Sequence, residues 1–406
     1  MTPADLESLK QRVAADVARR AERLRAIAAE IHAHPELLFE ERFAADLLAS
    51  ELEAAGLEVE RGAFGVETAF AARPADGATG EPASRPAADG PTVAILCEYD
   101  ALPGIGHGCG HNLIAAAGLG AGLAAASVVG ETGGRLVVLG TPAEEGGGGK
   151  VVMIERGAFD GVDAAMMVHP ASLDLAEPEA IAIATWRVEY RGVAAHAAAF
   201  PERGRNALDA AVLGYNAVAA LRQHIAPDER VHGVFLEAGR KPNIVPDHTV
   251  AEWYVRSGTL ATLQPLKERV LACLEAGARA AGCEMTWEPT APEYAELRSN
   301  RPLLDRYKAN SEAIGRPVDE PTPTKRVVCS TDMGNVSHEV PSIHPLVAVP
   351  PPDVPLHTAE FARWATSEEA GRAVVDGATA MAMTALDVWL GDGVAGEIRD
   401  AFEPAP

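Results

Sequence analysis

Between residues 92 and 169, apolar strand-like runs alternate with helix-like segments, and this alternation restricts the chain to few folds. The apolar runs are 92–100, 134–141 and 162–169, and the helix-like segments between them are 112–126 and 150–157. Strands that alternate with helices along the chain form a parallel sheet covered by helices. We therefore expect an α/β domain with a helix-covered, mostly parallel sheet.

The pattern changes near Ala180 and predicts a second domain. From there the chain reads as strand, helix, two strands, helix and strand, over 181–192, 206–225, 231–239, 248–257, 262–282 and 283–289. This β-α-β-β-α-β order is that of a compact ferredoxin-like α+β module. Helices and apolar strands resume beyond Tyr294. We therefore predict an inserted domain at 181–293 within a catalytic domain formed by 1–180 and 294–406.

The remaining segments predict helices and one connection. Residues 1–41 have the charge pattern of an amphipathic helix and lack the apolar core of a signal peptide, and a second helix is expected near 40–56. Residues 72–91 are rich in Pro, Gly and Ala and predict an exposed connection. The apolar run 113–129 contains glycines and predicts a buried helix rather than a membrane span.

The composition argues against polyanionic partners. The 406 residues include 35 Lys and Arg against 58 Asp and Glu, which gives a formal charge of -23. This charge repels nucleic acids and anionic membranes, although a local arginine in a cleft could still bind one acidic substrate. Five cysteines without regular spacing do not form a disulfide framework, so we expect a cytoplasmic protein.

Side chains able to bind a metal or a proton stand where the predicted strands end or helices begin. They are Cys109, His111, Glu144, Glu145, His169 and His357. Because the carboxyl ends of parallel strands meet at one edge of a sheet, we expect these side chains to form one site. Thiolate, imidazole and carboxylate together suit zinc, and imidazole and carboxylate also suit manganese. The sequence therefore predicts a metal-dependent enzyme.

The adjacent Glu144 and Glu145 indicate two different roles. Neighbouring carboxylates repel each other unless a cation or a shared proton compensates their charges. One carboxylate can bind a metal while its neighbour accepts a proton from water. Asp100, which precedes the glycine-rich string, could accept a hydrogen bond from a metal-binding histidine and fix its tautomer.

Simpler interpretations exist for each of these residues. Cys109 and His111 could belong to a flexible glycine turn, and the two glutamates to a solvated acidic loop. His169 could be a core residue, and His357 a helix cap. Cys109 could also be a nucleophile that uses a histidine base. The metal site is the better interpretation because it explains all the positions together and gives the paired glutamates a role.

Six blocks of the sequence resemble those of one enzyme family. They are CEYDALPGIGHGCGHN, GTPAEEGGGGK, YRGVAAHAAAFPERGRNALDA, KPNIVPDHTVAEWYVRS, STDMGNVSHEVPSIHP and HTAEF. Their types and their order, from about residue 31 to about residue 365, resemble the M20 family of metallopeptidases and amidohydrolases. The most similar branch contains an aminobenzoyl-glutamate hydrolase subunit and the M20-domain dipeptidases.

This resemblance implies a role for each matching residue. The implied metal ligands are Cys109, His111, Glu145, His169 and His357, with Glu144 as general base and Asp100 as the orienting carboxylate. One or two divalent ions, zinc or manganese, are implied, together with a homodimer formed through the inserted domain, which would act as a lid. In that domain His196 would polarise the scissile carbonyl, commonly in the partner's site, and Asn243 and Arg256 would hold the substrate.

Three departures from the family pattern leave details open. Glu98 stands where many members have a histidine, so a full two-metal site is not implied. Asn112 stands where close relatives often carry aspartate. Residues 193–195 read Val-Ala-Ala where a Lys and a Ser are frequent, and this leaves the substrate preference open.

The sequence thus predicts a metal-dependent amidohydrolase. Its expected substrate is a small molecule: an N-acyl amino acid, a dipeptide or an aminobenzoyl-glutamate-like compound. The alternative is a non-catalytic binding protein or regulatory subunit on the same fold. Glu144 argues against this alternative, because a pure binding protein needs no base beside a metal ligand.

Overall fold

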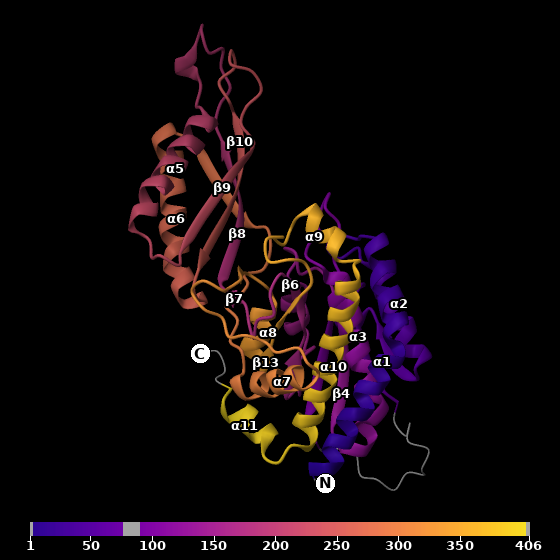
Figure 1. The fold of residues 1–406 in the computed structure, drawn as a ribbon. Helices are drawn as coiled ribbons and strands as arrows, with labels where there is room; N and C mark the ends of the chain where they lie inside the picture. Colours follow the sequence, from indigo (N-terminus) through magenta and orange to yellow (C-terminus); the bar gives the residue numbers. More distant parts are fainter. Residues whose placement is uncertain (1–2, 76–89, 403–406) are drawn as a thin grey trace. The chain divides into compact units, whose positions relative to one another are not determined.

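The computed structural model describes residues 3–75 and 90–402, which form two compact units (Figure 1). Unit 1 comprises Met1–Glu179 and Leu297–Pro406, and unit 2 comprises Ala180–Glu296. The boundaries predicted for the inserted domain differ from those of unit 2 by one residue at the start and three at the end. Most of the predicted connection at 72–91 lies outside the described residues.

A six-stranded sheet lies at the centre of unit 1, with the strand order β1-β2-β4-β3-β5-β13. Its strands are β1 Leu57–Arg61, β2 Phe70–Pro74, β3 Thr92–Glu98, β4 Arg135–Thr141, β5 Ala164–Met166 and β13 Ser342–Ile343. The four strands from β4 to β13 are parallel, whereas β1 and β2 pair antiparallel with their neighbours. The expectation of an α/β fold is confirmed, but the sheet is mixed, because a short connection between β1 and β2 permits only antiparallel pairing.

Alternating residues of the parallel strands bury both faces of this sheet. On one face Ile95 and Cys97 of β3 pack with helices α1, α3 and α10, which lie side by side in Figure 1. On the other face Ala94 and Leu96 pack with α4 and α8. The bounds are α1 Pro3–Ala33, α3 His111–Thr132, α4 Gly149–Ile154, α8 Met333–Glu339 and α10 Glu368–Leu390. The continuous apolar runs therefore reflect strands that are covered on both sides.

Glycines let α3 lie directly on the sheet. A Cβ at Gly118 would stand 2.4 Å from the carbonyl oxygen of Leu96, and one at Gly122 would stand 2.5 Å from Cγ2 of Val138. Helices α3 and α10 are each long and apolar enough to cross a membrane by length and composition, yet 83% of each apolar window is buried within the fold. Both helices are therefore core elements of unit 1.

The predicted strand 162–169 is two strands, which corrects the interpretation that His169 ends a strand. The chain leaves the large sheet after β5, and His169 begins β6 His169–Ala171. Strand β6 pairs in parallel with β14 Leu346–Ala348 in a separate two-stranded sheet. The apolar run continues across the break because β6 and β14 are also mostly buried, so the sequence pattern alone does not reveal the break.

Unit 2 has the element order β8, α5, β9, β10, α6, β11. The bounds are β8 Ala182–Arg191, α5 Ala207–Leu221, β9 Arg230–Glu237, β10 His248–Ser257, α6 Leu260–Ala281 and β11 Glu284–Pro289. The strands form an antiparallel sheet in the order β11-β8-β10-β9. Alternate residues of β8, including Trp186 and Tyr190, pack with both helices, as the period of two in a one-sided sheet requires.

The other described α-helices and strands are shorter. They are α2 Arg42–Ala54, α7 Arg301–Ala313, α9 Ala359–Trp364, α11 Val394–Asp400, β7 Glu179–Ala180 and β12 Val328–Cys329. The predicted N-terminal helices correspond to α1 and α2.

Candidate active site

A glycine-rich turn brings Cys109 to the start of α3. Gly110 precedes the helix with a φ of 78°, a conformation that glycine adopts without steric cost. The Cys109 sulfur lies 3.5 Å from Nε2 of His169, and the rings of His111 and His169 meet edge to face with centroids 5.6 Å apart. Burial raises the pKa of the Cys109 thiol, and the negative charge of Glu145 raises it further.

Glu145 and His357 approach this group from two other segments. Oε1 of Glu145 lies 3.5 Å from Nε2 of His357 and 3.8 Å from Nε2 of His111. His357 has a φ of 63°, which is uncommon for a residue with a side chain. Its backbone N–H donates to the carbonyl oxygen of Gly108 at 2.9 Å. This contact ties the segment before α9 to the turn that carries Cys109.

The five side chains predicted to bind metal therefore come together around Cys109. Donor atoms of Cys109, His111 and His169 lie within 4.8 Å of one another, as do those of Cys109, Glu145 and His357. Among the described residues, none forms a hydrogen bond with the buried atoms Nε2 of His111 and Oε1 of Glu145. Buried polar atoms without partners are costly, and a divalent cation would satisfy both. The mixed sulfur, nitrogen and oxygen donor set thus fits a metal ion.

Asp100 orients the centre through two hydrogen bonds. Its Oδ1 lies 3.0 Å from Nδ1 of His111, and its Oδ2 accepts from the backbone N–H of Glu145 at 2.9 Å. Contact at Nδ1 directs the opposite ring nitrogen of His111 toward the other donors. Burial also opposes ionisation of Asp100, yet the neighbouring His111 keeps its pKa below the usual value.

Glu144 lies in the same centre with a different environment. Burial raises its pKa well above the usual value, and the charge of Glu98 raises it further. Its Oε2 is 4.0 Å from Nε2 of His111. Oε1 of Glu98 lies 3.1 Å from the same nitrogen. Glu98, His111 and Glu144 thus form a third group of possible ligands.

A buried ion cluster next to the centre was not predicted from the sequence. Lys150 is fully buried, and its ammonium bonds Glu98 and, at 2.8 Å, Oδ1 of Asp332. Attraction to these carboxylates outweighs burial and raises the pKa of Lys150. The only feature of the sequence that points to Lys150 is its position directly after the glycine run. Its partners come from the end of β3 and the start of α8, so the cluster exists only in the folded chain.

The three remaining predicted residues belong to unit 2, where they occupy opposite ends of the sheet. His196 pairs with Ile244 in an isolated antiparallel β-bridge. The carbonyl oxygen of Asn243 accepts a hydrogen bond from the backbone N–H of Ala197 at 3.1 Å. His196 and Asn243 therefore lie close together. This pair stands before β10, whereas Arg256 is the ninth of its ten residues. The eight residues of β10 that precede Arg256 span roughly 27 Å.

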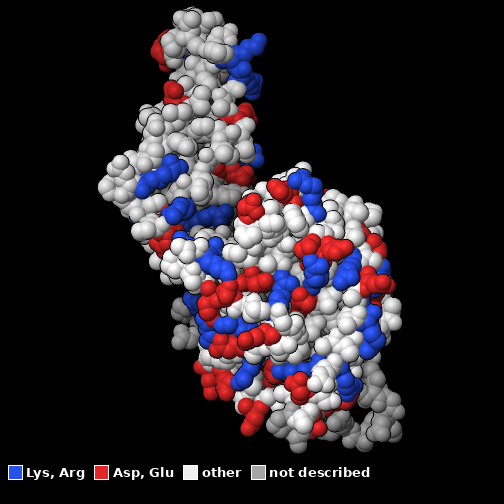
Figure 2. All heavy atoms as spheres, viewed as in Figure 1, with Lys and Arg blue, Asp and Glu red and all other residues white. Residues whose placement is uncertain are grey.

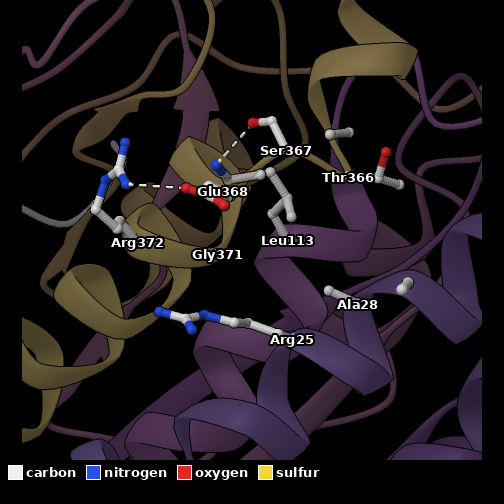
Figure 3. A pocket seen from close by; sticks show the side chains of 11 residues that line it. Arg25, Ala28, Leu113, Thr366, Ser367, Glu368, Gly371 and Arg372 are labelled. Carbon is white, nitrogen blue, oxygen red and sulfur yellow. Dashed lines mark hydrogen bonds and ion pairs between the residues drawn. The ribbon is translucent and has the colours of Figure 1, made fainter.

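A pocket of about 430 Å³ lies elsewhere in unit 1, between α1 and the start of α10 (Figure 3). Ala28 and Ala365 line it, and their carbonyl oxygens accept hydrogen bonds from the Asn112 side chain at 3.0 and 3.1 Å. Asn112 therefore joins α3 to α1 and to the segment before α10. The pocket lining contains neither a histidine nor a cysteine, so we do not assign the metal site to it.

Comparison with known proteins identifies the family to which this chain is similar. A family model described as peptidase family M20/M25/M40 matches residues 94–387. The Xaa-Arg dipeptidase of Mus musculus is 40% identical over 411 residues, which cover 98% of this chain and 93% of that protein. A p-aminobenzoyl-glutamate hydrolase subunit of Escherichia coli (strain K12) is 36% identical over 275 residues, which cover 62% of this chain and 54% of that protein.

Solved structures share the fold. The crystal structure of an aminobenzoyl-glutamate utilization protein from Klebsiella pneumoniae matches with a TM-score of 0.73 at 20% identity, and the match covers 92% of this chain and 98% of that one. From the family match and the similarity over nearly its whole length, the chain belongs to peptidase family M20/M25/M40 and is a hydrolase of amide bonds.

Proposed function

We propose that this protein is a metal-dependent hydrolase of dipeptides or related N-acyl amino acids, including compounds like aminobenzoyl-glutamate. The observation that carries the proposal is the group formed by Cys109, His111, Glu145, His169 and His357, in which Cys109 and His111 are buried and His357 is exposed. We assign these five as ligands of one or two divalent ions, zinc or manganese. The donor set does not by itself select between the two metals, and their availability contributes to the choice.

The residues of this chain can be given separate steps. A bound divalent ion would supply Lewis acidity toward a water molecule and the scissile carbonyl. Glu144 would accept a proton from the attacking water and return it to the leaving amine. Asp100 would hold His111 in the required tautomer. His196 would donate a hydrogen bond to the developing oxyanion.

The arrangement of unit 2 supports action of His196 in the site of a partner subunit. A dipeptide spans only about 7 Å. One unit 2 cannot present both ends of β10 to the same dipeptide, because they are roughly 27 Å apart. If His196, Asn243 and Arg256 all contact substrate, they therefore contact it in two different sites. We assign His196 and Asn243 to the site of the partner subunit and Arg256 to the carboxylate of the substrate.

We propose that unit 2 is a ferredoxin-like lid through which two copies dimerise. Strand β9 is an edge of its sheet, and Val234, Phe235 and Leu236 on it are 61%, 39% and 54% exposed. Val212 and Leu213 of α5 are also exposed. Figure 2 shows wide uncharged areas on unit 2, whereas acidic and basic side chains are mixed over unit 1. An exposed apolar edge strand needs cover, and a second copy provides it.

Dipeptides with a basic C-terminal residue are the first substrates to test. The relative with 40% identity is an Xaa-Arg dipeptidase, and the charge of -23 favours the approach of cationic substrates. A cytoplasmic location, proposed from the cysteine usage, would give access to such small peptides.

Amine release measured on a substrate panel tests the proposal. Protein stripped of metal and then loaded with zinc or manganese is given Xaa-Arg dipeptides, N-acetyl amino acids and p-aminobenzoyl-glutamate. We expect metal-dependent hydrolysis of at least one class. Glu144→Gln should keep the metal content while turnover falls by about 10²- to 10⁴-fold. Metal binding without hydrolysis of any of these classes would refute the proposed function. Loss of metal in Glu144→Gln would mean that the roles of Glu144 and Glu145 are reversed.

A further inference from the structure

We infer that Glu41 is a positioning residue, which holds a strained backbone turn at Ala143 and thereby aims Glu144. This inference rests on the proposed function of Glu144 as the base. Glu41 lies outside the centre in sequence, in the segment that leads into α2. Its side chain is fully buried, although it is ionisable and was not among the predicted site residues. A buried carboxyl group in such a place needs a structural or functional reason.

The contacts of Glu41 supply that reason. Its Oε1 accepts a hydrogen bond from the backbone N–H of Ala143 at 2.9 Å and another from that of Phe39 at 3.0 Å. Ala143 and Phe39 have φ values of 61° and 61°, a left-handed conformation that residues with side chains rarely adopt. One carboxylate oxygen therefore holds two strained backbone positions together. Strained residues persist only where their surroundings fix them, and they gather at functional sites.

The strained turn packs into the glycine run that follows it. A Cβ at Gly149 would stand 1.8 Å from the carbonyl oxygen of Pro142, and one at Gly147 would stand 2.7 Å from Cβ of Ala143. Glycine is therefore required at both positions for the turn to close. Since Ala143 directly precedes Glu144, its backbone angles set the direction in which the Glu144 side chain leaves the chain.

Three buried carboxyl groups each accept a hydrogen bond from a different backbone N–H group of the loop 142–150. Glu41 accepts from the N–H of Ala143 at 2.9 Å. Asp100 accepts from the N–H of Glu145, and Asp332 accepts from the N–H of Lys150, both also at 2.9 Å. Asp100 also contacts His111, and Asp332 also bonds the Lys150 ammonium. Replacing either of these two would disturb other parts of the centre. Glu41 is therefore the anchor whose removal reports most directly on the turn at Ala143.

Two substitutions with opposite properties separate geometry from charge. Glu41→Gln keeps the length and an acceptor oxygen, so we expect kcat within about threefold of wild type. Glu41→Asp keeps the charge but is one methylene too short to reach the Ala143 N–H, so kcat should fall by about 10- to 100-fold, the scale of an ångström-sized misplacement. KM and metal content should change little in both variants. Exposed Glu40→Gln is the matched control and should behave as wild type.

A change at Ala143 tests the same inference independently of overall stability. Glycine adopts the left-handed conformation without strain, so Ala143→Gly should reduce the penalty of Glu41→Asp severalfold in the double variant. An equal penalty in both backgrounds, or a larger loss of kcat in Glu41→Gln than in Glu41→Asp, would overturn the inference. Wild-type protein that hydrolyses no amide would instead refute the proposed function, so the two failures are distinguishable.

Discussion

At the scale of single residues, the centre combines groups that would repel each other without a cation. Glu98, Asp100, Glu144 and Asp332 are all buried within unit 1, and Lys150 is the buried cation that contacts two of them. Isolated buried charges are expensive, and pairing or metal binding offsets the cost. A negative interior next to unpartnered ring and carboxylate atoms is therefore more consistent with a metal centre than with a solvated acidic loop.

Arg256 offers a residue-scale test of substrate recognition. The guanidinium group binds a carboxylate through two parallel hydrogen bonds, which a lysine cannot reproduce. Arg256→Lys should therefore lower kcat/KM for dipeptides with a free carboxylate. The corresponding loss of transition-state stabilisation should be about 1.5–3 kcal/mol. Dipeptide amides should lose little from the same change. Equal losses for acids and amides would show that Arg256 is structural.

At the scale of elements, the close packing of helix α3 on the sheet sets the position of His111. Gly118→Ala would place a Cβ 2.4 Å from the Leu96 carbonyl oxygen, so the helix would have to shift. We expect the free energy of unfolding to fall by about 1–3 kcal/mol, the usual cost of overpacking, together with weaker metal retention. Denaturant unfolding and metal analysis measure both effects.

Gly396→Ala is the control for this prediction. Gly396 lies in α11, and a Cβ there would meet no other part of the described chain within 4 Å. Alanine has the higher helix propensity, so the variant should be as stable as wild type or more stable. A neutral Gly118→Ala would show that α3 can move away from the sheet without loss.

At the scale of the whole molecule, the proposed dimer predicts complementation between inactive chains. Homodimers of Glu144→Gln lack the base, and homodimers of His196→Ala lack the oxyanion donor. If His196 serves the partner's site, a mixed dimer contains one site in which both residues are intact. Mixing the two variants should therefore restore activity, up to about one quarter of the wild-type level after random exchange. Light scattering checks the dimer, and confirmed exchange without recovery would place His196 in its own chain's site.

Local periodicity determined much of the architecture from the sequence. Strands β3 and β4 were predictable because a strand buried on both faces has a continuous apolar run. Strand β8 was predictable because a strand buried on one face alternates between apolar and polar residues. The element order of unit 2 followed in the same way. The strand-end positions of Cys109, Glu144 and Glu145 also followed, since parallel strands end at a common edge. The separate roles of these residues came from the family resemblance.

Only the tertiary structure decided the features that depend on distant partners. The break before His169 is invisible in a continuous apolar run, because both resulting strands are buried. Glu41 and Ala143 are 102 positions apart, and Lys150 and Asp332 are 182 apart. No sequence period links such pairs, since they meet only after several helices and strands have packed. The sequence by itself thus determined which elements form and at which end of the sheet the candidate site residues lie, whereas long-range packing decided how the loop 142–150 is held.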